Sequence, residues 1–247
     1  MTNANIIEGR NPVIEALKSG REIEKILISK GNKEGSIKKI LAVAKEKGIP
    51  IQYVDKNKIN QISVSHAHQG VIAYVAAYKY YEVDELLERA RSKDEEVFLI
   101  ILDEITDPHN LGSIIRTANA AGAHGIIIPK RRAAGLTAIV AKTSAGAIEY
   151  VPVSRVTNIS RTIDYLKEQG VWIVGADMDG EKLYYESDLK GDVALVIGSE
   201  GQGISRLVKK KCDFLVKLPM KGEVTSLNAS VAASILMYEI LRQRDNS

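Results

Sequence analysis

Short, unbroken runs of apolar residues recur along the second half of the chain, and they limit the fold more than any other feature. Six of them, separated by helical or loop segments, are FLIILD (98–103), GIIIP (125–129), AIEYVPV (147–153), WIVGAD (172–177), VALVIG (193–198) and FLVKLP (214–219). Apolar runs of this length, many of them β-branched, are typical of strands covered by helices on both faces. The pattern predicts a parallel α/β sheet that begins near Val97 and ends in a long helix over 227–244.

Residues 1–76 show a separate and shorter alternation of helix and strand signals. We expect helices over 11–17 and 35–48 and around Lys58, and strands over 25–29, 51–54 and 70–78. The segment 77–96 is charged and helical only in its middle, which favours a linker. The chain is therefore expected to hold two α/β domains, at 1–76 and 97–247, joined by that linker.

The composition, 247 residues with 45% hydrophobic content, is typical of a soluble globular protein. No run reaches the roughly 18 apolar residues of a membrane span, and the start lacks the features of a signal peptide, so we expect a cytoplasmic protein. The single cysteine, Cys212, excludes an internal disulfide and a multi-cysteine zinc site. His66 and His68 have a metal-ligand spacing but no acidic or cysteine partner nearby, which favours a polar loop or an RNA contact; we expect no metal.

The distribution of charge is more informative than the net charge of +3. Residues 1–76 carry 12 Lys and Arg against 7 Asp and Glu, whereas the rest of the chain carries 22 against 24. A basic excess at the N-terminal end would help to neutralise nucleic-acid phosphates. A solvated basic surface explains the charge equally well.

The first of three polar segments that follow predicted strands runs from Asp103 to Gly122. Asp107 followed by Pro108 predicts a helix start. Gly112, Arg116 and Asn119 then share a face separate from the apolar one. Arg116 is thus suited to gripping a phosphate or carboxylate, although a solvated arginine would explain an isolated helix of this kind.

The second polar segment is the glycine-rich loop GSEGQGIS, 198–205. Its glycines follow the order G-x-x-G-x-G, the reverse of the dinucleotide fingerprint, and the loop does not follow the first strand of the domain. This order disfavours a nicotinamide-dependent oxidoreductase. Glycines allow close backbone approach to a ligand and Glu200 can accept hydrogen bonds, but a plain strand-to-helix turn remains an alternative.

The third polar segment runs from Leu218 to Ile240. Thr225 and Ser226 offer hydroxyl groups that could cap the final helix. Small residues at the start of that helix would let another backbone or a second subunit approach closely. Core packing is the alternative explanation for these small residues.

Together the three segments resemble the three motifs of the SpoU branch of the SPOUT RNA methyltransferases. The motifs are D-P-x-N-x-G-x-x-x-R-T-A (107–118), I-G-x-E-G-x-G (197–203) and L-P-M…S-L-N-A-S (218–230). EGRNPVIEAL (8–17) and HQGVIA (68–73) are similar to the substrate-binding domain of bacterial 23S rRNA guanosine 2′-O-methyltransferases. That domain resembles ribosomal protein L30e in fold.

The resemblance implies a knotted catalytic domain, a cofactor and a set of site residues. The domain would be an α/β parallel sheet with a C-terminal trefoil knot that holds S-adenosylmethionine, following a small L30e-like RNA-binding domain. The enzyme would be a homodimer with RNA crossing the subunit interface. The motifs imply cofactor contacts at Ile197, Gly198, Gly201, Leu218, Met220, Ser226 and Leu227. They imply a catalytic set of Asn110, Arg116, Glu200, Ser226 and Asn228.

The implied reaction is methyl transfer from S-adenosylmethionine to the 2′-oxygen of a guanosine ribose in 23S rRNA. Arginine does not readily deprotonate, so we assign Arg116 to the target phosphate and the developing alkoxide, and we assign Glu200 to orienting Arg116 or Asn110. Methylation of a tRNA guanosine and antibiotic-resistance methylation of rRNA stay open. A non-catalytic ribosome-assembly protein is disfavoured by the complete polar set. The sequence does not identify the methylated nucleotide, nor whether free rRNA or an assembling particle is the substrate.

Overall fold

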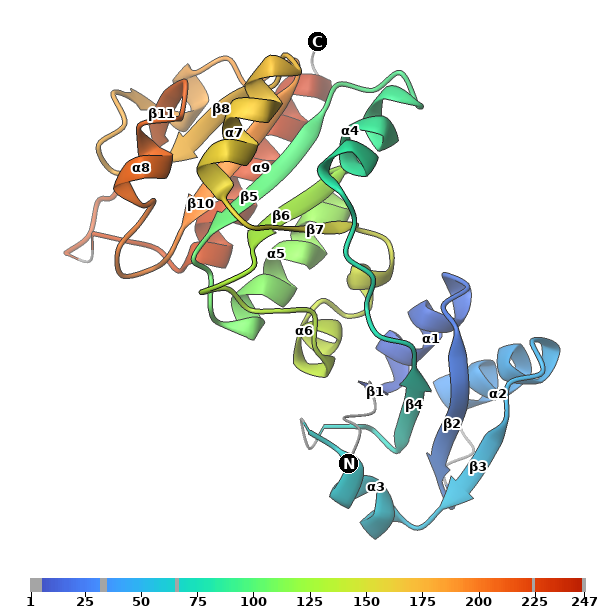
Figure 1. The fold of residues 1–247 in the computed structure, drawn as a ribbon. Coiled ribbons are helices and arrows are strands. Elements are labelled where there is room, and N and C mark those ends of the chain that lie inside the picture. The colour runs from blue at the N-terminus through green and yellow to red at the C-terminus, as the bar shows by residue number, and fades with distance from the viewer. Residues whose placement is uncertain (1–5, 32–34, 65–66, 224, 246–247) are drawn as a thin grey trace. The chain divides into compact units, whose positions relative to one another are not determined.

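The computed structural model describes residues 6–31, 35–64, 67–223 and 225–245 and divides into two compact units (Figure 1). The first unit contains Met1–Lys79 together with Gly135–Tyr150, and the second contains Tyr80–Ala134 and Val151–Ser247. Within the described ranges, no helix combines the length and apolar character needed to cross a membrane.

The second unit is built on a seven-stranded sheet in the order β7-β6-β5-β10-β8-β11-β9. Every pairing in it is parallel, as expected. The strands are β5 (Phe98–Asp103), β6 (Gly125–Pro129), β7 (Val153–Val156), β8 (Trp172–Ala176), β9 (Lys182–Leu183), β10 (Val193–Gly198) and β11 (Phe214–Lys217). Continuous apolar runs form the central strands because both faces of this sheet are covered.

Helices cover both faces of this sheet (Figure 1). They are α4 (Val83–Arg91), α5 (Pro108–Ala120), α7 (Ile159–Glu168), α8 (Arg206–Lys209) and α9 (Ala229–Asp245). The helices α4, α7 and α8 share one core cluster with the sheet, whereas α5 and α9 pack against each other on the opposite face. The long C-terminal helix is therefore confirmed.

Two expectations about this region need correction. The segment 77–96 is not a linker throughout, because Leu86, Leu87 and Ala90 of α4 are fully buried in the core of the second unit. Their helical spacing is the signal that the abundant charges concealed. The apolar run 147–153 is not one strand either: residues Ala147–Glu149 form a 3₁₀ turn, and β7 begins only at Val153.

The first unit contains a four-stranded sheet in the order β1-β4-β2-β3. The strands are β1 (Ile6–Glu8), β2 (Ile23–Ser29), β3 (Ile51–Val54) and β4 (Val71–Val75), and the helices are α1 (Arg10–Lys18), α2 (Ser36–Glu46) and α3 (Lys56–Ile62). The short strand β1 was not expected, and it pairs antiparallel with β4. One face of the sheet packs against α1 and α2, and Ile59 of α3 packs on the other.

A second stretch of chain completes the first unit. Between β6 and β7, residues 135–150 form α6 (Ala138–Thr143) and the turn Ala147–Glu149, and Ala138 packs against the apolar cluster that also contains Ile59. Glu149 accepts hydrogen bonds from Arg21 and from the Tyr78 hydroxyl, both at 3.1 Å, in a largely buried cluster. Burial raises the pKa of Glu149. These contacts show why residues 135–150 group with the first unit rather than with the strands beside them in sequence.

Candidate active site

The carboxyl ends of neighbouring parallel strands meet at one edge of the second unit's sheet. Register pairs Gly198 of β10 with Asp103 of β5, and Ile197 with Ala176 of β8. Ligands of open α/β sheets bind at this edge, where the connecting loops converge. The polar segments singled out in the sequence are these loops.

The glycine-rich loop folds back on itself directly after β10. Ser199 and Gly203 exchange two backbone hydrogen bonds, at 3.1 and 2.8 Å, and Gly203 has a φ of 64°. A Cβ atom on Gly198 would lie 2.0 Å from the carbonyl carbon of Gly203, so this position admits only glycine. Gly201 has open space around it. The reversed order of glycines thus follows from a tight hairpin that needs its first and last glycine.

Three polar side chains from separate segments meet beside this loop, and we call them the polar triangle: Asn110, Glu200 and Asn228. The Asn110 amide donates to Glu200 Oε1 at 2.8 Å, and the Asn228 amide donates to Asn110 Oδ1 at 3.0 Å and also to Glu200 Oε1. Asn110 is 6% exposed, whereas Glu200 and Asn228 are exposed. The triangle therefore spans from the protein interior to a surface that a large substrate can reach.

Asn228 also caps the final helix. Its Oδ1 atom accepts hydrogen bonds from the backbone N–H groups of Ser230 and Val231, at 2.9 and 3.3 Å. The expectation that Thr225 and Ser226 provide this cap is wrong, because α9 begins only at Ala229. Asn228 takes that place since an asparagine directly before a helix satisfies its first free N–H groups.

Arg116 lies apart from the polar triangle. It is exposed on α5, and its side chain forms no hydrogen bond or ion pair with any described residue of this chain. Of the two partners expected for Glu200, the structure brings Asn110 to it and not Arg116. Asp107 does cap α5 as expected, accepting from His109 N at 2.9 Å. Arg116 thus remains available to a charged group from outside the chain.

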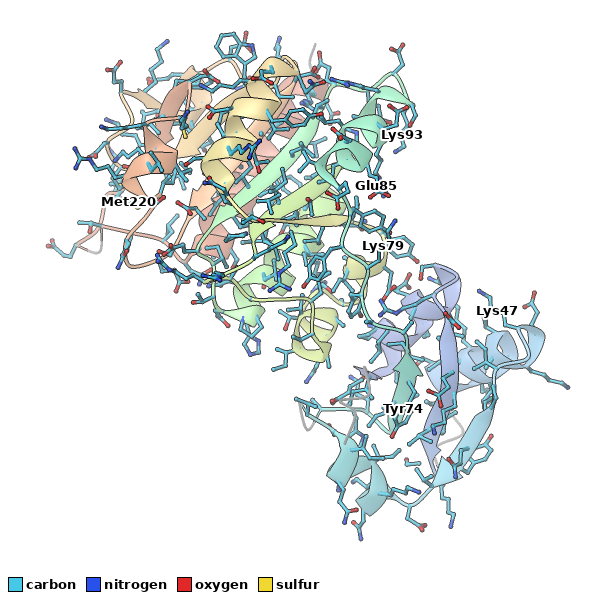
Figure 2. All side chains as sticks on the ribbon, viewed as in Figure 1. Lys47, Tyr74, Lys79, Glu85, Lys93 and Met220 are labelled. Carbon is cyan, nitrogen blue, oxygen red and sulfur yellow. The ribbon has the colours of Figure 1, made fainter. Side chains whose placement is uncertain are left out.

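A cavity of about 410 Å³ opens beside the loop and the triangle. Among the residues expected to contact a cofactor, those that line it are Ile197, Gly198, Leu218, Met220, Ser226 and Leu227. Met220 lies on the segment between β11 and α9 (Figure 2). Gly201 does not line the cavity, because it is at the tip of the hairpin.

Sequence reasoning missed several residues of the cavity wall. Asp177 and Met178 follow β8, Lys209 ends α8, and Ala229 and Ala232 belong to the first turns of α9. Asp177 had a signal, since it follows an apolar strand at the ligand-binding edge of the sheet. Lys209 had none, because it belongs to a run of three lysines that reads as a solvated helix face.

Two other residues considered for chemistry, Cys212 as a nucleophile and His68 as a metal ligand, have structural roles instead. Burial raises the pKa of the Cys212 thiol to about 12, which disfavours the thiolate that a nucleophile requires. His68 Nε2 lies 2.8 Å from Asn60 Oδ1, and its Nδ1 accepts from Gly70 N at 2.9 Å, so both ring nitrogens have protein partners. His66 lies outside the described residues. Within those residues, no group of three or more His, Cys, Asp or Glu side chains is placed to hold a metal.

The cavity suits a small molecule with both apolar and polar parts. Its volume is within the usual range of about 300–1,000 Å³ for such sites. Apolar walls from Ile197, Val216 and Leu218 adjoin half-buried backbone at Gly198, the last residue of β10, and charged groups at Asp177 and Lys209. A parallel α/β unit with this cavity beside a carboxylate–amide cluster has the arrangement of an enzyme domain that holds a cofactor next to a polar reaction site.

The chain belongs to the SpoU rRNA methylase family, whose profile matches residues 97–238. Residues 6–81 match the profile described as RNA 2′-O ribose methyltransferase substrate binding. A Bacillus subtilis (strain 168) protein named as a TrmH family tRNA/rRNA methyltransferase, YacO, is 56% identical over 237 residues, which cover 96% of this chain and 95% of that protein. A Staphylococcus aureus (strain COL) protein of the same family name is 50% identical, with 97% and 96% coverage.

Solved structures of SpoU and rRNA methyltransferases have a similar fold over nearly the whole length of this chain. The SpoU methyltransferase AviRb from Streptomyces viridochromogenes, in complex with the cofactor AdoMet, has a TM-score of 0.82 and 25% identity, covering 98% of this chain and 91% of that one. The AdoMet-bound rRNA methyltransferase from Sinorhizobium meliloti has a TM-score of 0.78 and 26% identity, with 98% and 88% coverage. The chain is therefore an S-adenosylmethionine-dependent RNA 2′-O-methyltransferase with a substrate-binding domain, as its motifs predicted.

Proposed function

We propose that this enzyme methylates the 2′-oxygen of a guanosine ribose in 23S rRNA. The observation that carries the proposal is agreement with an rRNA methyltransferase over both units. The match to the Sinorhizobium meliloti rRNA methyltransferase covers 98% of this chain, whereas the match to the A. aeolicus TrmH/SpoU tRNA modifying enzyme covers 65% with a TM-score of 0.55. The first unit, which matches a substrate-binding profile, is the part through which this chain would select rRNA.

The 410 Å³ cavity is the proposed cofactor site. Bound there, S-adenosylmethionine supplies an electrophilic methyl group on its sulfonium. The backbone at Gly198 and Leu218 and the side chains of Leu227 and Met220 would hold it, with Ile197 and Ser226 beside them. Gly201, at the hairpin tip, does not line the cavity as it stands. We keep it as a proposed cofactor contact through its backbone.

The polar triangle would shape the place where the ribose enters. Glu200 accepts from both amides, so it fixes the orientation of Asn110 and Asn228 before substrate arrives. Such preorganisation reduces the entropic cost of aligning the 2′-oxygen with the methyl group. Ser226, on the cavity wall, lies two residues before Asn228 and would help to shape the same place.

Arg116 is proposed to grip the phosphate of the target nucleotide and to stabilise the developing alkoxide. A guanidinium group has a pKa above about 12 and is therefore a poor proton acceptor, but its planar fork suits a phosphate. Its exposure on α5 fits this role, because RNA reaches it from solvent.

We also propose that the enzyme is a homodimer and that its second unit contains a trefoil knot. An apolar stripe on α9 supports the dimer: Val231, Ile235 and Tyr238 are 36–51% exposed and spaced for one helix side. The small residues at the start of α9, from which we expect a dimer, also pack inside the chain. Ala229 and Ala233 are buried, and α9 packs on α5.

Transfer of labelled methyl groups in vitro tests the proposed substrate. Purified protein, 23S rRNA and a tRNA mixture are incubated separately with labelled S-adenosylmethionine, and Arg116→Ala protein serves as the inactive control. We expect incorporation into 23S rRNA that the control lacks. Incorporation only into tRNA would replace the rRNA assignment, and cofactor binding without incorporation into any RNA would favour the non-catalytic alternative. A gain of resistance to a ribosome-targeted antibiotic on expression would favour the resistance activity.

A further inference from the structure

A partly buried ion pair forms one wall of the cavity, outside the three sequence motifs. Lys209 Nζ donates to Asp177 Oδ1 at 2.7 Å and to Asp179 Oδ2 at 2.5 Å. The side chains of Asp177 and Lys209 are 13% and 25% exposed, whereas that of Asp179 is 79% exposed. Asp177 is therefore the carboxylate of this group that is held at the cavity, and Asp179 is at its outer rim.

The backbone around Asp177 is fixed. Its N–H donates to Val216 O at 3.0 Å, and a turn follows in which Gly180 N donates to Asp177 O at 3.1 Å. A Cβ atom on Gly180 would lie 2.8 Å from the carbonyl carbon of Val216, so the turn is pressed against β11. The Oδ1 atom of Asp177 also accepts from Asp179 N at 2.9 Å. These contacts set the position of the carboxylate before any ligand binds.

The two oxygens of Asp177 differ in their partners. Oδ1 accepts both hydrogen bonds described above, whereas Oδ2 accepts none from the described residues. Oδ2 is 3.7 Å from the place where a Cβ of Gly203 would be, so it faces the hairpin at the cavity rim. A fixed carboxylate oxygen without a protein donor is a strong acceptor for a ligand hydroxyl.

S-adenosylmethionine carries two vicinal hydroxyl groups, on the ribose of its adenosine. A carboxylate at the end of a parallel strand is a known partner for such hydroxyls in nucleotide-binding α/β sheets. The cofactor also has two cationic groups, the sulfonium and the amino group. These would be attracted to Asp177 by charge alone and need no directed hydrogen bond. The two modes of recognition differ in which ligand atoms the affinity depends on.

We propose that Asp177 accepts a hydrogen bond from a ribose hydroxyl of the cofactor, with Lys209 as the positioning residue that holds the carboxylate. The inference rests on the proposed location of the cofactor in the 410 Å³ cavity. It assigns to this chain a recognition contact that none of its three sequence motifs contains.

Calorimetric binding of S-adenosylhomocysteine and of its 2′-deoxy and 3′-deoxy forms tests this contact. Wild-type protein is expected to lose about tenfold in affinity for one of the deoxy ligands, the usual loss of a hydrogen bond to a charged group. Asp177→Ala should bind the parent ligand about tenfold more weakly and no longer distinguish it from that deoxy form. Asp179→Ala, the matched control, should keep the wild-type discrimination.

Other outcomes overturn the proposal. If Asp177→Ala weakens all three ligands and still discriminates among them, the residue only supports the turn. If it weakens S-adenosylmethionine much more than S-adenosylhomocysteine, without loss of discrimination, Asp177 acts on the sulfonium by charge. For Lys209, we expect Lys209→Gln to lose part of the discrimination and Lys209→Arg to restore it; unchanged discrimination in Lys209→Gln would remove its positioning role.

A separate variant tests the location of the cofactor. Ala232, which is half-buried, lines the cavity, so Ala232→Phe should fill it and abolish binding of the parent ligand. Ala232→Leu is the smaller substitution if the first does not fold. Unchanged binding in a folded variant would place the cofactor elsewhere. If Ala232→Phe loses binding while Asp177→Ala keeps wild-type discrimination, the cofactor binds in the cavity and the proposed ribose contact of Asp177 is wrong.

Discussion

Asn228 joins two functions that substitution can separate. Its carbonyl oxygen caps α9 and its amide donates to Asn110 and Glu200. Asn228→Ala removes both sets of contacts, whereas Asn228→Ser keeps a hydroxyl that can cap the helix but cannot reach both partners in the polar triangle. The two variants therefore have different predicted effects on stability and the same predicted effect on methyl transfer.

The magnitudes follow from the contacts that each variant loses. The cap contributes about 1 kcal/mol, and each of the two amide hydrogen bonds, near the surface, contributes about 0.5 kcal/mol. Asn228→Ala should lower the free energy of unfolding of the second unit by about 2 kcal/mol and Asn228→Ser by about 1 kcal/mol. Both should lose most methyl transfer, because Glu200 then fixes only Asn110.

Fluorescence of the single tryptophan follows unfolding of this unit, since Trp172 lies on β8. Urea titration gives the free energies, and labelled methyl incorporation gives the activities. Equal losses of stability in the two variants would contradict the capping role. Full activity in Asn228→Ser would contradict the role of the triangle.

Three further predictions concern other parts of the second unit. Arg116→Lys should lose at least tenfold in methyl transfer while S-adenosylmethionine affinity stays unchanged, because a point charge replaces the planar fork; near-normal turnover would remove the phosphate-gripping role. Val231→Asp should convert the proposed dimer to a monomer in light scattering at micromolar concentration, whereas Trp172→Asp, at the exposed amino end of β8, should not; a monomeric wild type would refute the dimer. Because the pKa of Cys212 is raised to about 12, the folded state retains a proton that the unfolded chain loses above about pH 8.5, so stability should fall between those pH values; a Cys212→Ala variant with the same slope would contradict this.

The sheet of the second unit could be predicted because its strands need long apolar runs. Central strands β5 and β10 are covered on both faces, so their residues carry the pattern without interruption. The strand expected at 147–153 failed because a short apolar run does not reveal its period, and positive φ values at Ala145 and Gly146 turn the chain there. Strand β9 has only two residues, too few for any pattern.

Helix α4 and the segment 135–150 show a different limit. The charges of α4 face solvent, and only the three buried positions Leu86, Leu87 and Ala90 carry its packing, so composition alone suggested a linker. The placement of residues 135–150 depends on contacts with residues more than a hundred positions away, such as Arg21 with Glu149. Long-range pairings of this kind leave no local signal.

The residues of the candidate site also fall into those that the sequence predicted and those that it did not. The motifs named Asn110, Glu200 and Asn228, and the structure joins them by hydrogen bonds. They also named Arg116, which lies six positions after Asn110 on α5 and forms no side-chain hydrogen bond with the triangle. Asp177 and Lys209 were missed since an ion pair between the segment after β8 and the end of α8 is a property of the folded chain.

Mapping of 2′-O-methyl groups in the RNA of cells with and without this protein is the decisive test of the 23S rRNA assignment. Cells that express Arg116→Ala protein serve as the control for loss of catalysis alone. We predict that one guanosine in 23S rRNA loses its 2′-O-methyl group both in the deletion strain and in the control, while tRNA methylation is unchanged. An unchanged 23S rRNA map, with a methyl group missing from tRNA instead, would show that the enzyme acts on tRNA.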